Sequence, residues 1–373
     1  MNKNSFDINE VLSKYNFEGH YKEFYPSNHG HINNTFVLEF VNNEGKTVKY
    51  ILQQINVSVF KQPVQLMENI VRVTGHLYDK VLEGGGDPAR ETMNVIFTRD
   101  NSSYFIDREG RYWRCYNFVP NSYTLQQIEN PKMFYNAAKA FGKFQHMLAD
   151  FPIETLHETI PNFHNTVVRL EDLKKAVEKD DAGRVSTVKK EIEFALKREN
   201  DTAVLLNLAA EGLLPTKVTH NDTKLNNVMF DIDTDEGICV IDLDTVMPGL
   251  SLYDFGDSIR FGANTAAEDE KDISKVSLDL ELFETYLSGY LSAAGNSLNS
   301  YEIDYLPFSA KLLTLECGIR FLTDYINGDV YFRAAYSDHN LVRCRTQFAL
   351  VADMEDKMDI MNEITDGIKK ELS

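Results

Sequence analysis

Alternation of apolar and polar positions marks the first third of the chain and predicts β-strands there. Residues 30–40 are increasingly rich in β-forming residue types, and apolar and polar residues alternate over 47–55. A polar turn with Asn and Gly at 42–45 separates the two runs. Two such runs joined by a short turn are typical of a β-hairpin. Shorter strands are expected nearby, over residues 93–99, 103–106 and 111–118.

Helical spacing of the apolar residues dominates the rest of the chain. Between the hairpin and the short strands, the pattern predicts a helix that begins at Pro63 and ends at the glycines 84–86. Residues 125–214 are mostly helical in pattern. A β-rich island follows at 217–244, and helical spacing resumes from about residue 274.

These patterns together predict an α+β protein built from two lobes. Residues 1–118 would form a small β-rich lobe with one main helix. Residues 119–373 would form a larger, mostly helical lobe that contains the β island. A cleft between two lobes is a common place for a ligand site.

Composition and charge narrow the functional classes. The 373 residues are 43% apolar and 25% charged, as in a folded soluble protein. Acidic residues outnumber basic ones by 57 to 38, and a net charge of −19 disfavours binding to nucleic acid or to anionic membranes. No apolar run approaches the roughly 18 residues needed to span a bilayer, no signal peptide is visible, and the four cysteines lie far apart. We therefore expect a cytoplasmic protein.

The strongest chemical motif lies in the β island. Residues 219–227 read Thr-His-Asn-Asp-Thr-Lys-Leu-Asn-Asn, and an Ile-Asp-Leu-Asp segment follows. This is the H-x-D-x-x-x-x-N layout of a kinase-like catalytic loop, followed by a strand that ends in Asp. Phosphoryl transfer needs a carboxylate to accept the hydroxyl proton and oxygen ligands for Mg²⁺. Asp222 is the candidate base, and Asn227 and Asp242 are the candidate metal ligands.

Several acidic residues near this motif have other expected roles. Asp254 begins an Asp-Phe-Gly sequence, but it lies off the strand that should carry the metal ligand, so Asp242 is preferred. Asp254 and Asp257 are expected to support the loop by accepting hydrogen bonds from its backbone or from His220. For Asp244 three roles stay open, namely a contact to a second metal ion, a contact to the acceptor, or capping.

The small lobe offers a candidate phosphate-binding loop. Gly30, Asn33 and Thr35 belong to a His-Gly-His-Ile-Asn-Asn-Thr segment between strand-like runs, where exposed N–H groups can cradle phosphates. A plain Asn/Gly hairpin turn is the alternative. Gln53 stands where a kinase-like fold places its phosphate-binding lysine, so it can donate hydrogen bonds but brings no charge. Without that lysine, Glu68 has no partner for the usual ion pair.

The sequence resembles the aminoglycoside phosphotransferase/choline kinase group, which has the two-lobed protein-kinase-like fold. Within this group it is most similar to the bacterial N-acetylhexosamine 1-kinases. The segments that carry the resemblance span nearly the whole chain: 30–36, 50–56, 220–231, 241–249, 253–260, 318–329 and 339–347.

The resemblance implies ATP- and Mg²⁺-dependent phosphorylation of the anomeric hydroxyl of N-acetylglucosamine or N-acetylgalactosamine. It matches Asp222 to the catalytic aspartate and Asn227 and Asp242 to the metal positions. The branch also lacks the usual lysine, which leaves open the group that neutralises the α/β-phosphates. Adenine is expected at the crossing between the lobes, through backbone atoms near Tyr116 and Phe118.

The acceptor site is expected around a late helix. Arg320 and Asp324 lie four positions apart, hence on one helix face, where Arg320 would bind sugar hydroxyls or the acetamide. An ion pair within the helix is an equal alternative. His31 and Tyr331 are further candidates for the sugar pocket, as is Asp244. Two rival functions stay open: a kinase of another small hydroxyl compound such as homoserine, and a catalytically silent nucleotide-binding scaffold.

Overall fold

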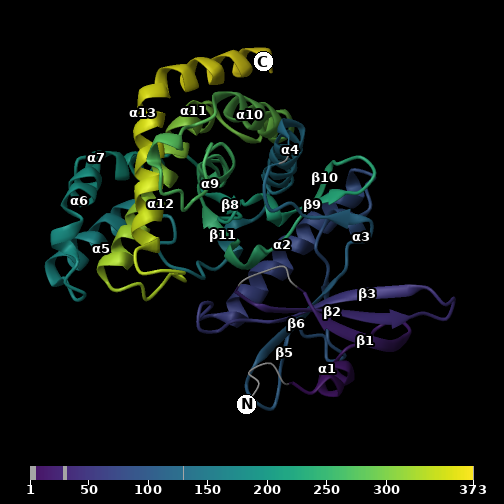
Figure 1. Cartoon of the computed structure of the whole chain (residues 1–373). Coiled ribbons are helices and arrows are strands. Elements are labelled where there is room, and N and C mark those ends of the chain that lie inside the picture. The colour runs from purple at the N-terminus through teal and green to yellow at the C-terminus, as the bar shows by residue number, and fades with distance from the viewer. Residues whose placement is uncertain (1–5, 28–31, 129, 373) are drawn as a thin grey trace.

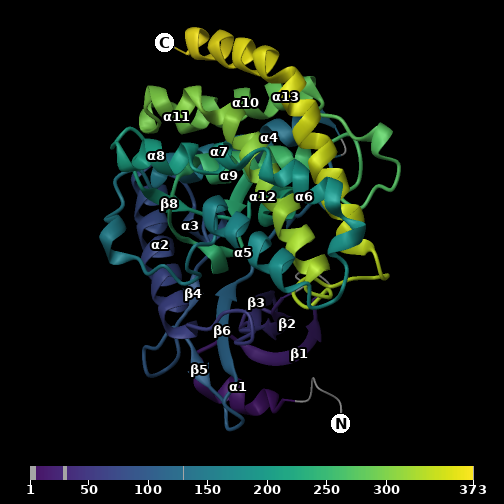
Figure 2. The same cartoon turned by 90° about the vertical axis from the view of Figure 1, so that its left-hand side faces the viewer.

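The computed structural model describes residues 6–27, 32–128 and 130–372. Two lobes are stacked along the long axis of the molecule, with a β-sheet lobe at one end and a helical lobe at the other (Figure 1). The long C-terminal helix crosses the helical lobe and bends over its far end (Figure 2). No helix among the described residues is both long and apolar enough to cross a membrane.

The N-terminal lobe contains a six-stranded antiparallel sheet in the order β1-β2-β3-β6-β4, with β5 also paired to β6. Its elements are α1 (Ile8–Lys14), β1 (His20–Pro26), β2 (Asn34–Val41), β3 (Thr47–Gln54), α2 (Pro63–Glu83), α3 (Pro88–Glu91), β4 (Val95–Ile96), β5 (Phe105–Ile106) and β6 (Tyr112–Asn117). The predicted hairpin is confirmed, because β2 and β3 pair without a register shift. The predicted helix is confirmed as α2, which begins at Pro63 and is capped by Gly84.

Two parts of the N-terminal lobe differ from the prediction. Helix α1 and strand β1 were not predicted. Strand β1 is exposed along most of its length, so it lacks the apolar side that makes a strand recognisable. The strand expected over residues 93–99 is only two residues long, at β4.

The C-terminal lobe surrounds two small antiparallel sheets with helices. The strands are β7 (Ser122–Tyr123), β8 (Lys217–Thr219), β9 (Val228–Asp231), β10 (Gly237–Val240) and β11 (Met247–Gly249), arranged as β10-β9-β7 and β11-β8. The α-helices are α4 (Pro131–Met147), α5 (Thr166–Lys179), α6 (Lys189–Leu196), α7 (Glu199–Thr202), α8 (Val204–Ala210), α9 (Ser251–Gly262), α10 (Leu280–Ala294), α11 (Ser300–Asp304), α12 (Leu306–Ile326) and α13 (His339–Glu371).

Helix α9 corrects the expectation that helical structure resumes only at about residue 274. Of its twelve residues only Phe261 is exposed, so the polar residues of α9 are buried and form no solvent-facing side. It packs directly against α12. A Cβ at Gly256 would lie 2.5 Å from the carbonyl oxygen of Ser309, so glycine permits this close approach. Asp254 and Asp257, which are expected to support the 219–227 loop, are thereby placed on a helix that packs closely against α12.

Candidate active site

Asp222 lies in the loop between β8 and β9, at the side of the C-terminal lobe that faces the sheet lobe. Its side chain is 27% exposed, and Lys224 Nζ lies 2.7 Å from Asp222 Oδ1. Asn227 Nδ2 donates to the backbone carbonyl of Asp222 at 2.8 Å and lies 3.3 Å from Oδ2. Partial burial disfavours the charge of Lys224, yet the Asp222 carboxylate raises the pKa of Lys224. The carboxylate is thus oriented from two sides and remains accessible.

His220 is a buried support of this loop. It lies between the rings of Phe141 and Phe144, whose centroids are 5.7 and 6.0 Å away. The tautomer with hydrogen on Nε2 satisfies both of its ring contacts, because Nε2 donates to the Ile241 carbonyl at 2.8 Å and Nδ1 accepts from the Asp222 N–H at 3.3 Å. His220 therefore connects the loop to the end of β10.

Two carboxylates on α9 hold the loop from below. Asp254 accepts from the backbone N–H of His220 at 2.9 Å and of Asn221 at 2.8 Å. Its carbonyl also accepts from the Thr223 hydroxyl, and Asp257 accepts from the Thr223 N–H at 3.1 Å. Asn221 has a positive φ of 64°, a conformation that Asn and Asp tolerate better than other side chains. The Asp-Phe-Gly sequence thus lies in a helix beneath the loop, and not at the strand end.

Asp242 stands just past the end of β10 and beside Asn227. The N–H of Ile241 donates to the Asn227 carbonyl at 2.9 Å, and Asp242 has a φ of 61°. Asp242 is exposed to solvent, but the neighbouring protein removes part of the water around its carboxylate. This partial desolvation, together with the neighbouring carboxylates of Asp244 and Asp222, raises the pKa of Asp242. A divalent cation placed here would relieve that repulsion.

The donor set fits Mg²⁺ shared with a ligand. Asp242 supplies a carboxylate, and Asn227 supplies an amide oxygen because its Nδ2 is used in the contacts to Asp222. In the described part of the chain, no group of three or more His, Cys, Asp or Glu side chains is arranged to hold a metal ion. A Mg²⁺ ion here would need further oxygens from water or phosphate, which is how Mg²⁺ is usually bound beside phosphates.

A row of polar side chains crosses the sheet above this site. Gln53 faces Thr35 on β2 and Arg114 on β6 in register. Its Nε2 donates to Thr35 Oγ1 at 3.1 Å, and its Oε1 accepts from Arg114 Nε at 3.0 Å. Arg114 Nη1 lies 2.5 Å from Asp244 Oδ1, and Asn33 Nδ2 donates to Asp244 Oδ2 at 2.5 Å. Asp244 therefore contacts two strands or loops of the N-terminal lobe, and it is one of the residues that join the two lobes.

The other residues predicted to bind the nucleotide lie in different parts of the chain. Gly30 and His31 lie outside the described residues. Tyr116 is buried on β6, and Phe118 follows the end of that strand, half-buried, with Lys49 Nζ 5.6 Å from the centroid of its ring. These two residues lie at the crossing between the lobes, since β7 begins soon after them.

Glu68 turns away from this row of polar side chains. Its carboxylate lies 2.6 Å from His157 Nε2 and 3.7 Å from Arg72 Nη2. The residue of α2 that contacts Arg114 is Met67, whose sulfur lies 3.9 Å from Nη1. The helix therefore presents a thioether, and not a carboxylate, to the position where a kinase ion pair is expected.

The predicted acceptor residues lie at the end of α12 and the loop after it. Arg320 is half-buried, with its guanidinium 5.5 Å from the ring centroids of both Phe163 and Phe332. Tyr331 is 68% exposed. Among the described residues no ion pair joins Arg320 to Asp324, so the intrahelical pair that the spacing allowed is not formed.

Asp324 instead organises the loop that follows α12. Its two carboxylate oxygens accept from the backbone N–H groups of Val330, Tyr331 and Phe332 at 2.8–3.0 Å. They also accept from Asn340 Nδ2 on α13 at 3.0 Å. Asp324 is itself 4% exposed, so its role in the structure is to fix the loop.

A buried chain of contacts connects α12 with the catalytic loop. Glu316, one helical turn before Arg320, accepts from Thr166 Oγ1 at 2.7 Å and lies 2.8 Å from His164 Nδ1. His164 Nε2 lies 3.3 Å from the Asn221 carbonyl. Arg320 is therefore placed near the loop that carries Asp222.

Three residues of this region were not predicted from the sequence. Lys224 stands two positions after Asp222, and a cation so close to a candidate base is a readable signal. Arg114 is a charged residue in an otherwise buried strand, Tyr112–Asn117, where an uncompensated charge would be costly. Glu316 had no such signal, because its partners His164 and Thr166 are distant in sequence.

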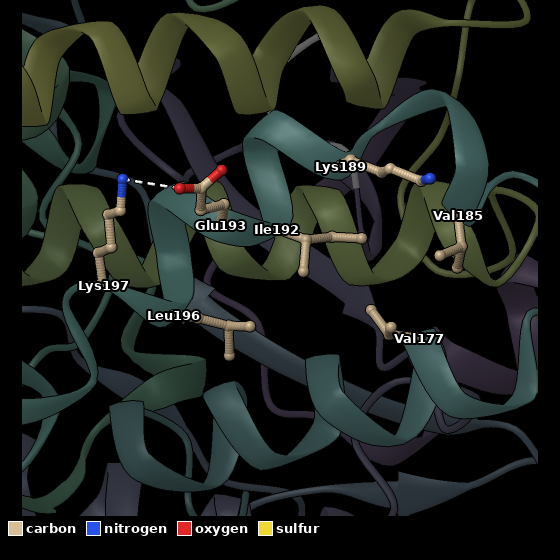
Figure 3. A pocket seen from close by; sticks show the side chains of 7 residues that line it. All are labelled: Val177, Val185, Lys189, Ile192, Glu193, Leu196 and Lys197. Carbon is tan, nitrogen blue, oxygen red and sulfur yellow. Dashed lines mark ion pairs between the residues drawn. The ribbon is translucent and has the colours of Figure 1, made fainter.

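A separate open hollow of about 490 Å³ lies between α5 and α6 (Figure 3). It is mostly apolar and has an ion pair of 2.7 Å between Glu193 and Lys197 at its edge. In Figure 1, α5 and α6 lie on the outer side of the helical lobe, away from β8 and β9. This hollow is therefore not part of the candidate active site.

Comparison with known proteins agrees with this architecture. The family model described as "Phosphotransferase enzyme family" matches residues 94–294. An aminoglycoside phosphotransferase from Alicyclobacillus acidocaldarius is 11% identical with a TM-score of 0.61, covering 99% of this chain and 98% of that chain. Amicoumacin kinase, solved with AMP-PNP, Ca²⁺ and Ami, is 12% identical with a TM-score of 0.58, covering 92% of each chain.

A third structure, spectinomycin phosphotransferase with ADP and its antibiotic, is 15% identical with a TM-score of 0.53, covering 96% of this chain and 97% of that chain. At these identities the similarity concerns the fold, and it confirms the two-lobed kinase-like α+β architecture. The family model covers more than half of the chain and includes the catalytic loop. The chain therefore belongs to the aminoglycoside phosphotransferase/choline kinase-like family of phosphotransferases.

Proposed function

We propose that this protein is an ATP- and Mg²⁺-dependent kinase that phosphorylates the anomeric hydroxyl of N-acetylglucosamine or N-acetylgalactosamine. Asp222 is the proposed catalytic base, and Asn227 and Asp242 are the proposed Mg²⁺ ligands. Family membership supports phosphoryl transfer. The resemblance of the segments around Arg320 and Asp324 to N-acetylhexosamine 1-kinases supports the sugar.

The catalytic step is a direct transfer of the γ-phosphoryl group to the sugar oxygen. Asp222 orients the acceptor hydroxyl and takes its proton as the new P–O bond forms, while the bond between the γ-phosphorus and the β–γ bridging oxygen of ATP breaks and ADP leaves. Bound Mg²⁺ supplies charge stabilisation on the phosphate oxygens. Lys224 and Asn227 hold the Asp222 carboxylate at the contacts described above, and Asp254 fixes the backbone on which it is mounted. Because these groups are already positioned, little reorganisation is needed at the moment of transfer.

The positive charge around Arg320 supports a neutral amino sugar as the acceptor. Its guanidinium lies between two aromatic rings, close to the catalytic loop, and a second arginine is near, since Arg320 contributes to lowering the pKa of Arg169 after the larger effect of burial. Two guanidinium groups repel an ammonium ion, whereas their N–H donors suit the neutral hydroxyl and acetamide oxygens of an amino sugar. Tyr331 and His31 complete the proposed sugar pocket, and Asp244 is retained as a proposed contact at its edge.

The remaining assignments follow the two lobes. Residues 1–118 form the proposed nucleotide-binding lobe, and residues 119–373 form the proposed lobe for the acceptor. Gly30, Asn33, Thr35 and Gln53 are proposed to face the phosphates. Backbone atoms near Tyr116 and Phe118 are proposed to bind adenine. We place the protein in the cytoplasm.

A kinase of a small amino alcohol is the second candidate function. An aminopropanol kinase and an ethanolamine kinase are among the proteins of similar fold, with TM-scores of 0.56 and 0.53 at 14% and 16% identity. Homoserine belongs to the same chemical class and also carries a carboxylate that could pair with Arg320. A catalytically silent scaffold is disfavoured because Asp222, Asn227 and Asp242 are all present.

The test is ADP release from MgATP with N-acetylglucosamine, N-acetylgalactosamine or homoserine, beside a reaction without acceptor. Sugar-dependent release that is lost in Asp222→Asn is the expected result, and phosphorus NMR of the product would then show a phosphate on the anomeric carbon. Release with homoserine alone would overturn the sugar assignment and keep the mechanism. Binding of MgATP without release for any acceptor in a wider panel would favour the silent scaffold.

A further inference from the structure

We propose that Arg114 is the cation that contacts the α/β-phosphates of the nucleotide, in place of the lysine that is absent at Gln53. This inference rests on the proposed ATP-dependent function and names the residue that its nucleotide site would otherwise lack. The charge would come from β6, the neighbour of the strand that usually supplies it.

The position of Arg114 carries the argument. It stands directly opposite Gln53 in the β3–β6 pairing, and Gln53 Oε1 accepts from Arg114 Nε at 3.0 Å. Gln53 is neutral, and its hydrogen bond holds the guanidinium of Arg114 beside the position from which the usual lysine would project. On α2, the residue that contacts Arg114 is Met67, which supplies no charge.

The far end of Arg114 points to the candidate metal site. Arg114 Nη1 lies 2.5 Å from Asp244, which is two positions after the proposed Mg²⁺ ligand Asp242. Asn33, next to the proposed phosphate loop, contacts the same carboxylate. Burial disfavours the charge of Arg114, but Asp244, with a smaller contribution from Asp242, keeps its pKa above the usual value. The guanidinium is therefore a permanent charge between the phosphate loop and the metal site.

Arg114 also retains donors for a ligand. A guanidinium has five N–H donors, and among the described residues only Nε and Nη1 have acceptors, so Nη2 donates to none. A buried ion pair alone stabilises a fold little, because apolar side chains of similar volume often serve as well. An arginine that is 1% exposed and fixed at both ends is more easily explained by a charged ligand, since guanidinium binds phosphate oxygens in a defined geometry.

The test compares binding of MgADP with binding of adenosine, which lacks the phosphates, by titration calorimetry. We expect Arg114→Met to raise the Kd of MgADP roughly 10- to 100-fold, the range for loss of a charge-assisted contact, and to leave the Kd of adenosine within about twofold. Arg114→Lys should recover part of the loss because it keeps the charge. Arg108→Met removes an exposed arginine of the same lobe and should leave both Kd values unchanged.

The double variant Arg114→Met/Asp244→Asn guards against misfolding, because it leaves no unpaired charge in the buried site. It should show the same selective loss of MgADP binding. An equal loss for MgADP and adenosine in both variants would make Arg114 a purely structural residue and overturn the proposal. Wild-type protein that binds MgADP but phosphorylates no sugar would overturn only the proposed acceptor, whereas wild-type protein that binds no MgADP would overturn both proposals.

Discussion

The catalytic loop and the loop after α12 are fixed in the same way but differ in what they present. In each case one buried aspartate on a helix accepts hydrogen bonds from backbone N–H groups of the loop, Asp254 in the first and Asp324 in the second. In the catalytic loop the functional side chain is fixed as well, because Lys224 and Asn227 contact Asp222. In the second loop, Val330 and Tyr331 are 77% and 68% exposed.

This difference matches the roles proposed for the two loops, catalysis for the first and acceptor recognition for the second. A carboxylate that takes a proton must be held within a few tenths of an ångström, so its backbone and its side chain are both constrained. A loop that recognises an acceptor needs a fixed backbone, but its exposed side chains can change without disturbing the fold. Proteins with 11–15% identity share this fold, and their names state different substrates. Family membership therefore indicates phosphoryl transfer, whereas the acceptor must be tested separately.

Replacing the candidate base should have the largest effect. Asp222→Asn keeps the size of the side chain but removes the proton acceptor, so kcat should fall roughly 10²- to 10⁴-fold. MgATP binding should stay nearly unchanged, as measured by calorimetry, because the role proposed for Asp222 is with the acceptor hydroxyl and not with the nucleotide. Asp233→Asn is the matched control, since Asp233 is an exposed carboxylate in the β9–β10 turn. Normal turnover of the Asp222 variant would end its assignment as the base.

Removing the buried support should lower both stability and rate. In Asp254→Asn an amide NH₂ would face the N–H of His220 or Asn221, so one hydrogen bond to a charged group becomes a clash of donors. We expect a loss of about 2–3 kcal/mol in the free energy of unfolding, measured by urea denaturation, and a lower kcat in the folded fraction. An unchanged urea midpoint would show that the loop does not depend on this carboxylate.

The sequence already indicated that the candidate catalytic and metal-binding residues lie near one another, because they are close in the chain. His220, Asp222 and Asn227 lie within one short segment, and Asp242 follows after one hairpin. Their spacing therefore already reflects their arrangement. The β2–β3 hairpin and α2 were equally readable, since one is defined by a short turn and the other by Pro63 and Gly84.

The features of the site and fold that were not predicted from the sequence depend on long-range contacts. The pair Arg114–Asp244 joins two lobes across a separation in sequence of 130 residues (244 − 114), and no local pattern indicates it. An ion pair of Asp324 with Arg320, four positions away, was one of two alternatives that the spacing left open, but the oxygens of Asp324 are used by a loop that no periodicity describes. Helix α9 was missed because its polar residues, Asp254 and Asp257 among them, are buried and serve the 219–227 loop, so they do not form the solvent-facing side that marks a surface helix.

The close contact between α9, the helix that carries Asp254, and α12 can be tested by overpacking. In Gly256→Ala the new Cβ would lie 2.5 Å from the Ser309 carbonyl, so α9 and α12 must move apart. Overpacking of this kind costs about 1–3 kcal/mol, and the urea midpoint should fall accordingly. Gly75→Ala on α2 is a matched control, because nothing lies within 4 Å of its Cβ position. Equal stability of the two variants would contradict a close α9–α12 contact.

The smallest expected effect concerns the acceptor loop. Asp324→Asn keeps one oxygen but places an NH₂ group opposite two donors, from Phe332 and Asn340, so the loop that carries Tyr331 should shift. We expect the KM for the sugar to rise on the order of tenfold, equivalent to about 1.4 kcal/mol, while kcat and the Kd of MgADP change little. Asp338→Asn, an exposed position before α13, is the control. A fall in kcat of similar size would show that the loop that carries Asp222 and the loop after α12 are not independent. An unchanged KM for the sugar would show that the loop after α12 takes no part in acceptor binding.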